Sequence, residues 1–301
     1  MSEQRSINSV LVVGAGAMCS QIAMVCALSG YDVVLNDISG EALDRAVTSL
    51  RSRMQRKIDK GTATSAEIDE AFARLRTTDV LDEDSCAVDL VIEAAIEKLD
   101  IKRELFSELE RLAPAGAILA SNSSSFVPSA IATELRERGR FCNIHFFNPA
   151  LVMRCVEVIR GPETSDDTIM TAVNFVRSIG KEPVQLDKEI SGFVANRILD
   201  AVRTEAVSLY EGGYASFEDI DLACRTALGY PMGPFELMDL TGIDIGYYSR
   251  SQRFADSGDP ADAPARSVAA LVERGDLGRK TGKGWYIYDE SGAKSGPNPD
   301  A

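Results

Sequence analysis

His145 is the only histidine of this 301-residue chain, and its side chain is the first candidate for acid–base chemistry. It opens the motif His-Phe-Phe-Asn-Pro at 145–149, at the end of a short apolar run, and Glu157 lies on the next apolar run. Histidine readily gives and takes a proton near neutral pH. A carboxylate beside it would fix the tautomer and stabilise the imidazolium. The alternative is a structural histidine that only satisfies hydrogen bonds.

A glycine-rich turn near the amino terminus indicates a phosphate site. The apolar run Ser9–Val13 predicts a buried parallel strand, and a helical pattern follows the turn. Gly14 permits a tight turn, and Gly16 lets backbone approach a pyrophosphate. The helix would then begin near Ala17 and Met18, with free N–H groups facing the phosphates. A plain turn is the alternative.

Asp37 ends the second predicted strand, about 20 residues after the turn, where a carboxylate can hold the adenosine ribose hydroxyls. No Arg or Lys follows Asp37 directly to pair with a 2′-phosphate, so we expect NAD rather than NADP. The alternative is that Asp37 is a solvent-exposed loop carboxylate without a ligand. Cys19 stands where the third glycine of the fingerprint would be. We expect its sulfur to push the helix away or crowd the pyrophosphate, and Cys19→Gly to tighten NAD binding.

Further polar residues follow other predicted strands, which span 90–93, 117–120, 141–147 and 155–159, with a last one at 184–187. In open α/β sheets ligands collect at the carboxyl ends of the strands. Five polar residues fall at such ends and should converge on one edge: Glu97, Asn122, Ser124, His145 and Asn148. The six cysteines form no Cys-x-x-Cys pair, so we expect no metal site and no disulfide frame.

These patterns predict an α/β fold with two domains. Residues 1–187 should form a Rossmann-type, doubly wound, mostly parallel sheet with an inserted helical pair at about 40–75, and residues 188–301 an all-α domain. We expect helices at 193–211, 217–228, 234–254 and 265–274. The Gly/Pro/Ser-rich tail after Asp289 should be loose.

Composition excludes several classes of protein. The net charge of −14 argues against nucleic acid as a partner, and no apolar run approaches a membrane span. Reduced thiols and a polar amino terminus indicate a cytoplasmic protein. Against this acidic background, Arg51, Arg53, Arg56 and Lys57 form a basic stripe in the helical pair. The stripe could meet a second phosphate-bearing ligand besides NAD, or it could be a solvated helix face.

Several long motifs in order resemble the short-chain L-3-hydroxyacyl-CoA dehydrogenase (3-hydroxybutyryl-CoA dehydrogenase) family. They are Gly-Ala-Gly-Ala-Met at 14–18, Ser-Asn-Ser-Ser-Ser at 121–125, His-Phe-Phe-Asn-Pro at 145–149, Val-Glu-Val at 156–158, Gly-Phe-Val-Ala-Asn-Arg at 192–197, Gly-Tyr-Pro-Met-Gly-Pro-Phe-Glu-Leu at 229–237 and Gly-Arg-Lys-Thr-Gly-Lys-Gly-Trp-Tyr at 278–286. The resemblance implies that His145 is the catalytic base, that Glu157 pairs with it, and that Ser124 and Asn196 contact the substrate. It also implies that Ser49 and Arg56, with Arg53 nearby, meet CoA, and that the chain is a homodimer.

The expected activity is hydride transfer between NAD and the C3 hydroxyl or keto group of a short 3-hydroxyacyl thioester such as 3-hydroxybutyryl-CoA, in fatty acid metabolism. The candidate cofactor contacts are Gly14, Gly16, Ala17, Met18, Asp37, Glu97, Lys102, Asn122 and Asn148. Two alternatives stay open: the same chemistry on a carrier-protein-bound or free hydroxy acid, and a non-catalytic NAD-binding protein. A hydrolase is weaker, because no nucleophile elbow surrounds Ser124.

Overall fold

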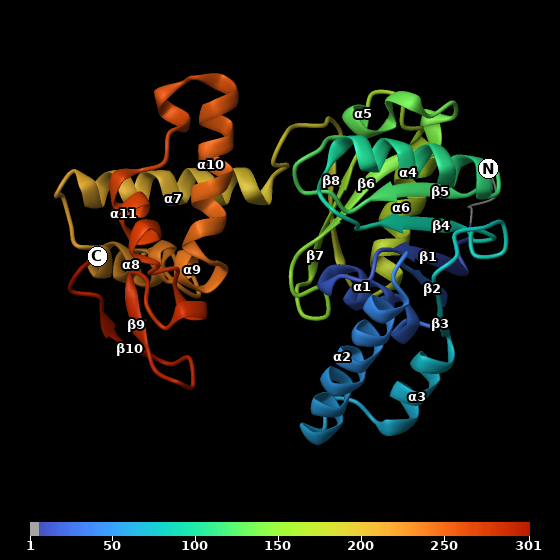
Figure 1. Cartoon of the computed structure of the whole chain (residues 1–301), viewed down its shortest axis with the longest axis horizontal. Coiled ribbons are helices and arrows are strands. Elements are labelled where there is room, and N and C mark those ends of the chain that lie inside the picture. The colour runs from blue at the N-terminus through green and yellow to red at the C-terminus, as the bar shows by residue number, and fades with distance from the viewer. Residues whose placement is uncertain (1–5) are drawn as a thin grey trace. The chain divides into compact units, whose positions relative to one another are not determined.

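The chain forms two compact units in the structure, a computed structural model that describes residues 6–301 (Figure 1). The first unit ends at Val194, and the second spans Ala195–Ala301. The sequence placed this boundary near Lys188. The first unit extends further because Phe193 is fully buried against Ile159 and Leu186.

The first unit is built on one eight-stranded sheet in the order β3-β2-β1-β4-β5-β6-β7-β8. Neighbouring strands are parallel except β6 and β7, which are antiparallel, so the predicted mostly parallel sheet is confirmed. The strands are β1 (Ser9–Val13), β2 (Asp32–Asn36), β3 (Leu75–Thr78), β4 (Leu90–Glu93), β5 (Ile118–Ser121), β6 (Phe141–Phe146), β7 (Cys155–Ile159) and β8 (Glu182–Leu186).

Helices cover both faces of this sheet, and each face has its own core. Alternate residues of β1 serve the two cores, because side chains of a strand point to opposite faces in turn. Val10 and Val12 pack with one set of helices, and Leu11 and Val13 with the other. The helices of the unit are α1 (Ala17–Leu28), α2 (Gly40–Asp59), α3 (Ser65–Ala73), α4 (Leu99–Leu112), α5 (Pro128–Ile131) and α6 (Asp166–Ser178).

The inserted helical pair α2 and α3 extends beyond the β3 edge of the sheet (Figure 1). Ser39 caps α2 by accepting a hydrogen bond from the Ala42 N–H, and Thr64 and Glu67 form a capping box at the start of α3. The sequence analysis ran the second helix to Leu75, which was wrong. Leu75 begins β3, whose Thr-rich sequence pairs with β2 and forms the edge of the sheet.

The second unit contains five helices among its described residues, with an aromatic core around Phe217, Phe235 and Trp285. They are α7 (Ala195–Glu211), α8 (Phe217–Thr226), α9 (Pro234–Thr241), α10 (Ile243–Ser257) and α11 (Arg266–Arg274). The single helix expected from Pro234 to Phe254 is two helices. Gly242, with φ +96°, breaks it, because a residue in that conformation cannot continue a right-handed helix.

The carboxyl-terminal tail is ordered, which corrects the expectation of a loose segment. Lys294–Pro297 (β10) pairs antiparallel with Tyr286–Tyr288 (β9). The hairpin is held by Asp239, whose buried carboxylate accepts hydrogen bonds from the N–H groups of Trp285 and Tyr286. None of the helices described in either unit has the length and apolarity needed to cross a membrane.

Candidate active site

The site centres on a histidine–glutamate pair set by the register of two strands. His145 on β6 lies directly opposite Glu157 on β7, and the two side chains share one face. His145 Nδ1 and Glu157 Oε2 are 2.9 Å apart, and both residues are buried. Because an ionised carboxylate can only accept hydrogen bonds, Nδ1 carries the proton and Nε2 keeps its lone pair. The imidazole is therefore held as the tautomer that can accept a proton at Nε2.

Phe193 and Val194, at the end of the first unit, contact the His145–Glu157 pair. Glu157 Oε1 accepts a hydrogen bond of 3.0 Å from the Val194 N–H, so both carboxylate oxygens are bonded. The rings of Phe147 and Phe193 flank the imidazole, with centroids 4.6 and 5.4 Å away. Phe193 adopts φ +50°, an uncommon conformation for a bulky residue. The sequence analysis missed this support, because nothing in the local pattern shows that residue 193 reaches β6.

His145 opens onto a cleft of about 320 Å³ at the carboxyl ends of the strands. The strand order reverses between β1 and β4, and the cleft lies beside this point. Ligands of such sheets usually bind there. The lining includes Met18, Glu97, Lys102, Asn122, Ser124, His145 and Asn148, all singled out from the sequence. The expected convergence at one edge is therefore observed.

A buried ion pair supports one wall of this cleft. The Lys102 Nζ lies 2.6 Å from Glu93 Oε1, and the two side chains are 1% and 0% exposed. Glu93 also accepts a hydrogen bond of 2.7 Å from the Ser121 hydroxyl. Lys102, expected to contact the cofactor, is thus also a structural anchor. Glu93 was missed, although a glutamate that ends an apolar strand is a detectable signal.

Glu97 connects this anchor to the serine-rich loop. Its Oε2 lies 3.1 Å from Lys102 Nζ, and its Oε1 accepts hydrogen bonds from the Ser123 hydroxyl (2.6 Å) and the Ser124 N–H (3.2 Å). Burial raises the pKa of Glu97, but Lys102 and Ser123 lower it more, so the net shift is downward. The carboxylate stays charged and pins the loop, while Ser124 itself is exposed at the cleft.

Asn122 ties the serine loop to the strand that carries the histidine. Its Oδ1 accepts a hydrogen bond of 2.8 Å from the Phe146 N–H, and its own N–H donates to the Glu93 carbonyl. Asn148 lies on the exposed side of the cleft. No group of three or more His, Cys, Asp and Glu side chains within residues 6–301 is placed to hold a metal ion.

The glycine turn fits a dinucleotide pyrophosphate. Gly14 has φ +109°, and a Cβ there would lie 2.8 Å from the Cys19 sulfur. Gly16 caps α1 with no side-chain hydrogen bond, and no acid occupies the first turn, so the amide groups of the helix start suit an anion. Asp37 Oδ2 accepts a hydrogen bond of 2.7 Å from the Ala15 N–H, which places its carboxylate beside the turn.

The Cys19 side chain points into the protein, toward the end of β4. The residue is 1% exposed, and its Sγ donates a hydrogen bond of 2.9 Å to the Ala94 carbonyl, at the end of β4. Burial raises the pKa of the thiol to about 11. The sulfur fills the space beneath Gly14 inside the protein, so it does not occupy the outer side of the turn, where crowding was expected.

The residues predicted to contact coenzyme A, and Asn196, lie outside the cleft lining. Ser49, Arg53 and Arg56 follow one another on α2 at spacings of four and three, which places them on one helix face. Ser49 and Arg56 are exposed, and Arg53 is half-buried. Asn196 lies in the first turn of α7, in the second unit.

Comparison with known proteins identifies the family. Residues 9–190 match the 3-hydroxyacyl-CoA dehydrogenase NAD-binding domain, and residues 192–288 match the 3-hydroxyacyl-CoA dehydrogenase C-terminal domain. The chain belongs to the 3-hydroxyacyl-CoA dehydrogenase family. The resemblance, the cofactor NAD and the enzyme class inferred from the sequence are thereby confirmed, and the chain is an NAD-dependent oxidoreductase of fatty acid metabolism.

Similar proteins match over nearly the whole chain. The human mitochondrial hydroxyacyl-coenzyme A dehydrogenase is 38% identical, covering 94% of this chain and 91% of its own length. A 3-hydroxybutyryl-CoA dehydrogenase of Bradyrhizobium diazoefficiens is also 38% identical, covering 97% and 98%. The crystal structure of (S)-3-hydroxybutyryl-CoA dehydrogenase from Ralstonia eutropha has 37% identity and a TM-score of 0.86, covering 95% and 100%.

Proposed function

We propose that this 3-hydroxyacyl-CoA dehydrogenase interconverts the 3-hydroxyl and 3-keto groups of short acyl-CoA thioesters, with His145 as the acid–base residue. The observation that carries the proposal is the buried bond between His145 Nδ1 and Glu157 Oε2 at the wall of a cleft. The relatives described as 3-hydroxybutyryl-CoA dehydrogenases support a short acyl chain.

The proton step follows from the tautomer. His145 Nε2 accepts the hydroxyl proton of the substrate, and Glu157 stabilises the imidazolium that forms. In the reverse direction, the imidazolium returns the proton to the keto oxygen. When bound, NAD supplies the acceptor for the hydride that leaves C3. The Ser124 hydroxyl, exposed at the cleft, donates a hydrogen bond to the reacting oxygen. Asn196 is assigned a substrate contact on the family resemblance alone.

The cofactor contacts divide between two features of the first unit. The glycine turn, with Ala17, Met18 and Asp37, holds the pyrophosphate and the ribose. The strand-end residues Glu97, Lys102, Asn122 and Asn148 border the cleft onto which His145 opens, and they would contact the nicotinamide end of the bound cofactor. For hydride transfer beside His145, the glycine turn and the strand-end residues would have to bind the two ends of the same NAD molecule.

Coenzyme A is held at the basic face of α2, through Ser49, Arg53 and Arg56. A flexible side chain with an unpaired guanidinium suits a phosphate, and no ion pair within residues 6–301 engages Arg53 or Arg56.

We further propose a homodimer, on the family resemblance, and a reducing compartment such as the cytoplasm, since all six cysteines are free.

Replacement of His145 tests the proposal. His145→Ala should lower kcat for acetoacetyl-CoA reduction by at least about 10²–10⁴-fold, the usual contribution of general acid–base catalysis. NADH binding, followed by cofactor fluorescence, should stay within about twofold, because no contact of His145 belongs to the glycine turn. Near-normal turnover of the variant would overturn the assignment.

A further inference from the structure

Phe193 has a backbone conformation that is unfavourable for its residue type. Its φ is +50°, in the left-handed region, and within residues 6–301 no other residue except glycine has a positive φ. Phenylalanine is uncommon in this region, because its Cβ comes too close to the following carbonyl oxygen. A residue stays in such a conformation only when the surrounding structure holds it there. The contacts of Phe193 should therefore show what the conformation is for.

The Phe193 side chain anchors this conformation. It is fully buried and packs with Ile159 of β7 and Leu186 of β8. On another side its ring lies against the imidazole of His145, with the centroids 5.4 Å apart. The ring therefore fixes the position of residue 193 relative to the base, and it does so from outside the lining of the cleft.

The chain on either side of Phe193 is also tied to the first unit. Before it, the Glu189 carboxylate accepts a hydrogen bond of 2.8 Å from the Ser129 N–H. After it, the Val194 N–H donates a hydrogen bond of 3.0 Å to Glu157 Oε1. The backbone angles of one residue decide where the N–H of the next residue points. The left-handed conformation of Phe193 thus directs the Val194 N–H at Glu157.

This bond leaves the two oxygens of Glu157 with separate partners. Oε1 accepts the hydrogen bond from Val194, and Oε2 faces His145 Nδ1 at 2.9 Å. A backbone N–H that donates to a carboxylate favours its charged form, and rotation of the carboxylate would break the bond. A charged carboxylate held in this orientation keeps the imidazole proton on Nδ1, so that Nε2 is left to accept a proton.

We propose that Phe193 is a positioning residue for the proton transfer. It holds the Val194 N–H against Glu157, and Glu157 in turn holds His145 in the tautomer that can act as the base. The inference rests on the proposed function, to which it adds a residue that lies outside the cleft lining. It predicts that the backbone conformation at position 193 controls kcat, and not only the size of the side chain.

Glycine and alanine at position 193 form a matched pair that tests the backbone conformation. Both remove the ring, but glycine adopts a positive φ readily, whereas alanine is disfavoured there. Phe193→Ala should lower kcat for acetoacetyl-CoA reduction by about tenfold or more, as for the loss of a hydrogen bond to a charged group. Phe193→Gly should retain a kcat about five- to tenfold above that of Phe193→Ala. NADH affinity should stay within about twofold in both variants.

NMR of the histidine ring gives a readout that does not depend on turnover. Because the chain has one histidine, labelling this residue type with a nitrogen isotope shows the ring of His145 alone. At a pH where the ring is neutral, the wild type should show the proton on Nδ1. Phe193→Ala should give a mixture of the two tautomers. Phe193→Leu, which can still pack with Ile159 and Leu186, should restore most of the wild-type pattern. A purely structural role would lower stability without changing the tautomer.

The same two substitutions at Phe175 are the control. Phe175 is a buried phenylalanine of α6, in the first unit and outside the cleft lining. Since its backbone is helical, alanine should be tolerated better than glycine there, which is the reverse of the order expected at Phe193. The tautomer of His145 should not change in either control variant.

Two results would overturn the inference: a kcat of Phe193→Ala within about twofold of the wild type, or no advantage of glycine over alanine at position 193. Should Phe193→Ala not fold, Phe193→Val replaces it, because a β-branched residue also disfavours a positive φ. The NMR measurement separates the two proposals. An unchanged tautomer in the Phe193 variants overturns only this inference, whereas a wild type inactive toward every thioester overturns only the proposed function.

Discussion

Replacing Glu157 by glutamine tests how much the carboxylate contributes to catalysis. The carboxylate bonds His145 Nδ1 at 2.9 Å in a site where both residues are buried, so water does not replace the lost charge. A hydrogen bond to a charged group contributes about 1.5–3 kcal/mol, and each 1.36 kcal/mol is tenfold in rate. Glu157→Gln should therefore lower kcat by about 10- to 150-fold.

The new amide adds a second effect of the same sign. Its oxygen can still accept the Val194 N–H, but its NH₂ would then face Nδ1 and favour the tautomer with the proton on Nε2. That tautomer cannot act as the base. Stopped-flow measurement of NADH oxidation would follow the chemical step, and NADH affinity should stay within about twofold.

A double-mutant cycle decides whether Glu157 acts through the histidine. In the His145→Ala background, Glu157→Gln should lower the rate by less than about threefold, since the group it assists is gone. Glu163→Gln is a matched control, because that exposed carboxylate pairs with Arg138 outside the cleft lining. Equal losses from Glu157→Gln with and without His145 would refute the argument.

Three further predictions concern the supports of the site. Lys102→Met should lower the free energy of unfolding by about 3–5 kcal/mol in urea titrations, because it leaves Glu93 charged and buried; Glu93→Gln in addition should recover part of the loss. Cys19→Gly should destabilise the protein by about 1–3 kcal/mol, through helix propensity and the lost bond to Ala94, and isothermal titration should show no tighter NADH binding. Arg56→Glu should raise KM for CoA thioesters by about two- to tenfold without raising it for pantetheine thioesters, and equal KM changes would place CoA elsewhere.

The sequence was sufficient for the main features of the first unit. Alternating strand and helix patterns predict a parallel sheet, and the carboxyl ends of parallel strands lie at one edge of the sheet. This is why Glu97, Asn122, Ser124, His145 and Asn148 could be placed in one cleft. Position at a strand end depends only on the local pattern, which a single sequence displays.

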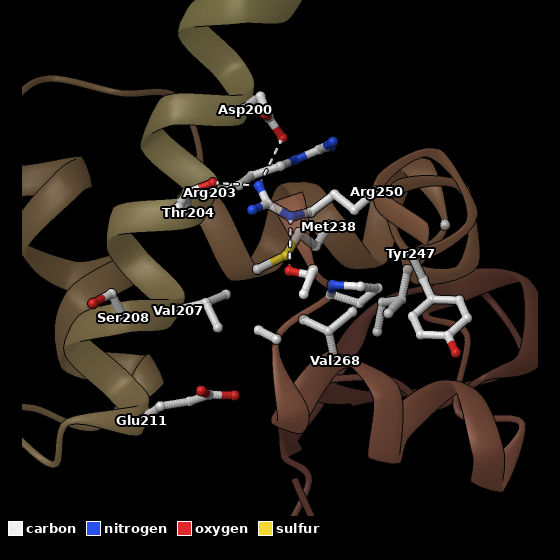
Figure 2. A pocket seen from close by; sticks show the side chains of 16 residues that line it. Asp200, Arg203, Thr204, Val207, Ser208, Glu211, Met238, Tyr247, Arg250 and Val268 are labelled. Atoms are coloured by element: carbon white, nitrogen blue, oxygen red, sulfur yellow. Dashed lines mark hydrogen bonds and ion pairs between the residues drawn. The ribbon is translucent and has the colours of Figure 1, made fainter. Parts of the chain in front are cut away.

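Features that depend on contacts between distant segments were out of reach. The Lys102–Glu93 pair needs α4 to fold back over β4, and the inward direction of the Cys19 sulfur depends on the Ala94 carbonyl of another strand. The strand at 294–297 forms because β9 offers it an edge, although its own Gly- and Pro-containing sequence disfavours a strand. The hydrogen bonds from Arg253 to Asp200 and from Arg250 to Thr204, the second of which is drawn in Figure 2, likewise join segments more than forty residues apart.

The antiparallel arrangement of β7 explains why one carboxylate can serve the base from such close range. In an antiparallel pair, opposite residues lie side by side on one face, so His145 meets Glu157 directly. A shift of one residue in this register would turn Glu157 to the other face of the sheet. The connection between β6 and β7 helps to set this register, and the register places Glu157 beside His145. Lys181 stabilises this connection, because its ammonium donates hydrogen bonds to the carbonyls of Ala150 (2.7 Å) and Met153 (2.8 Å).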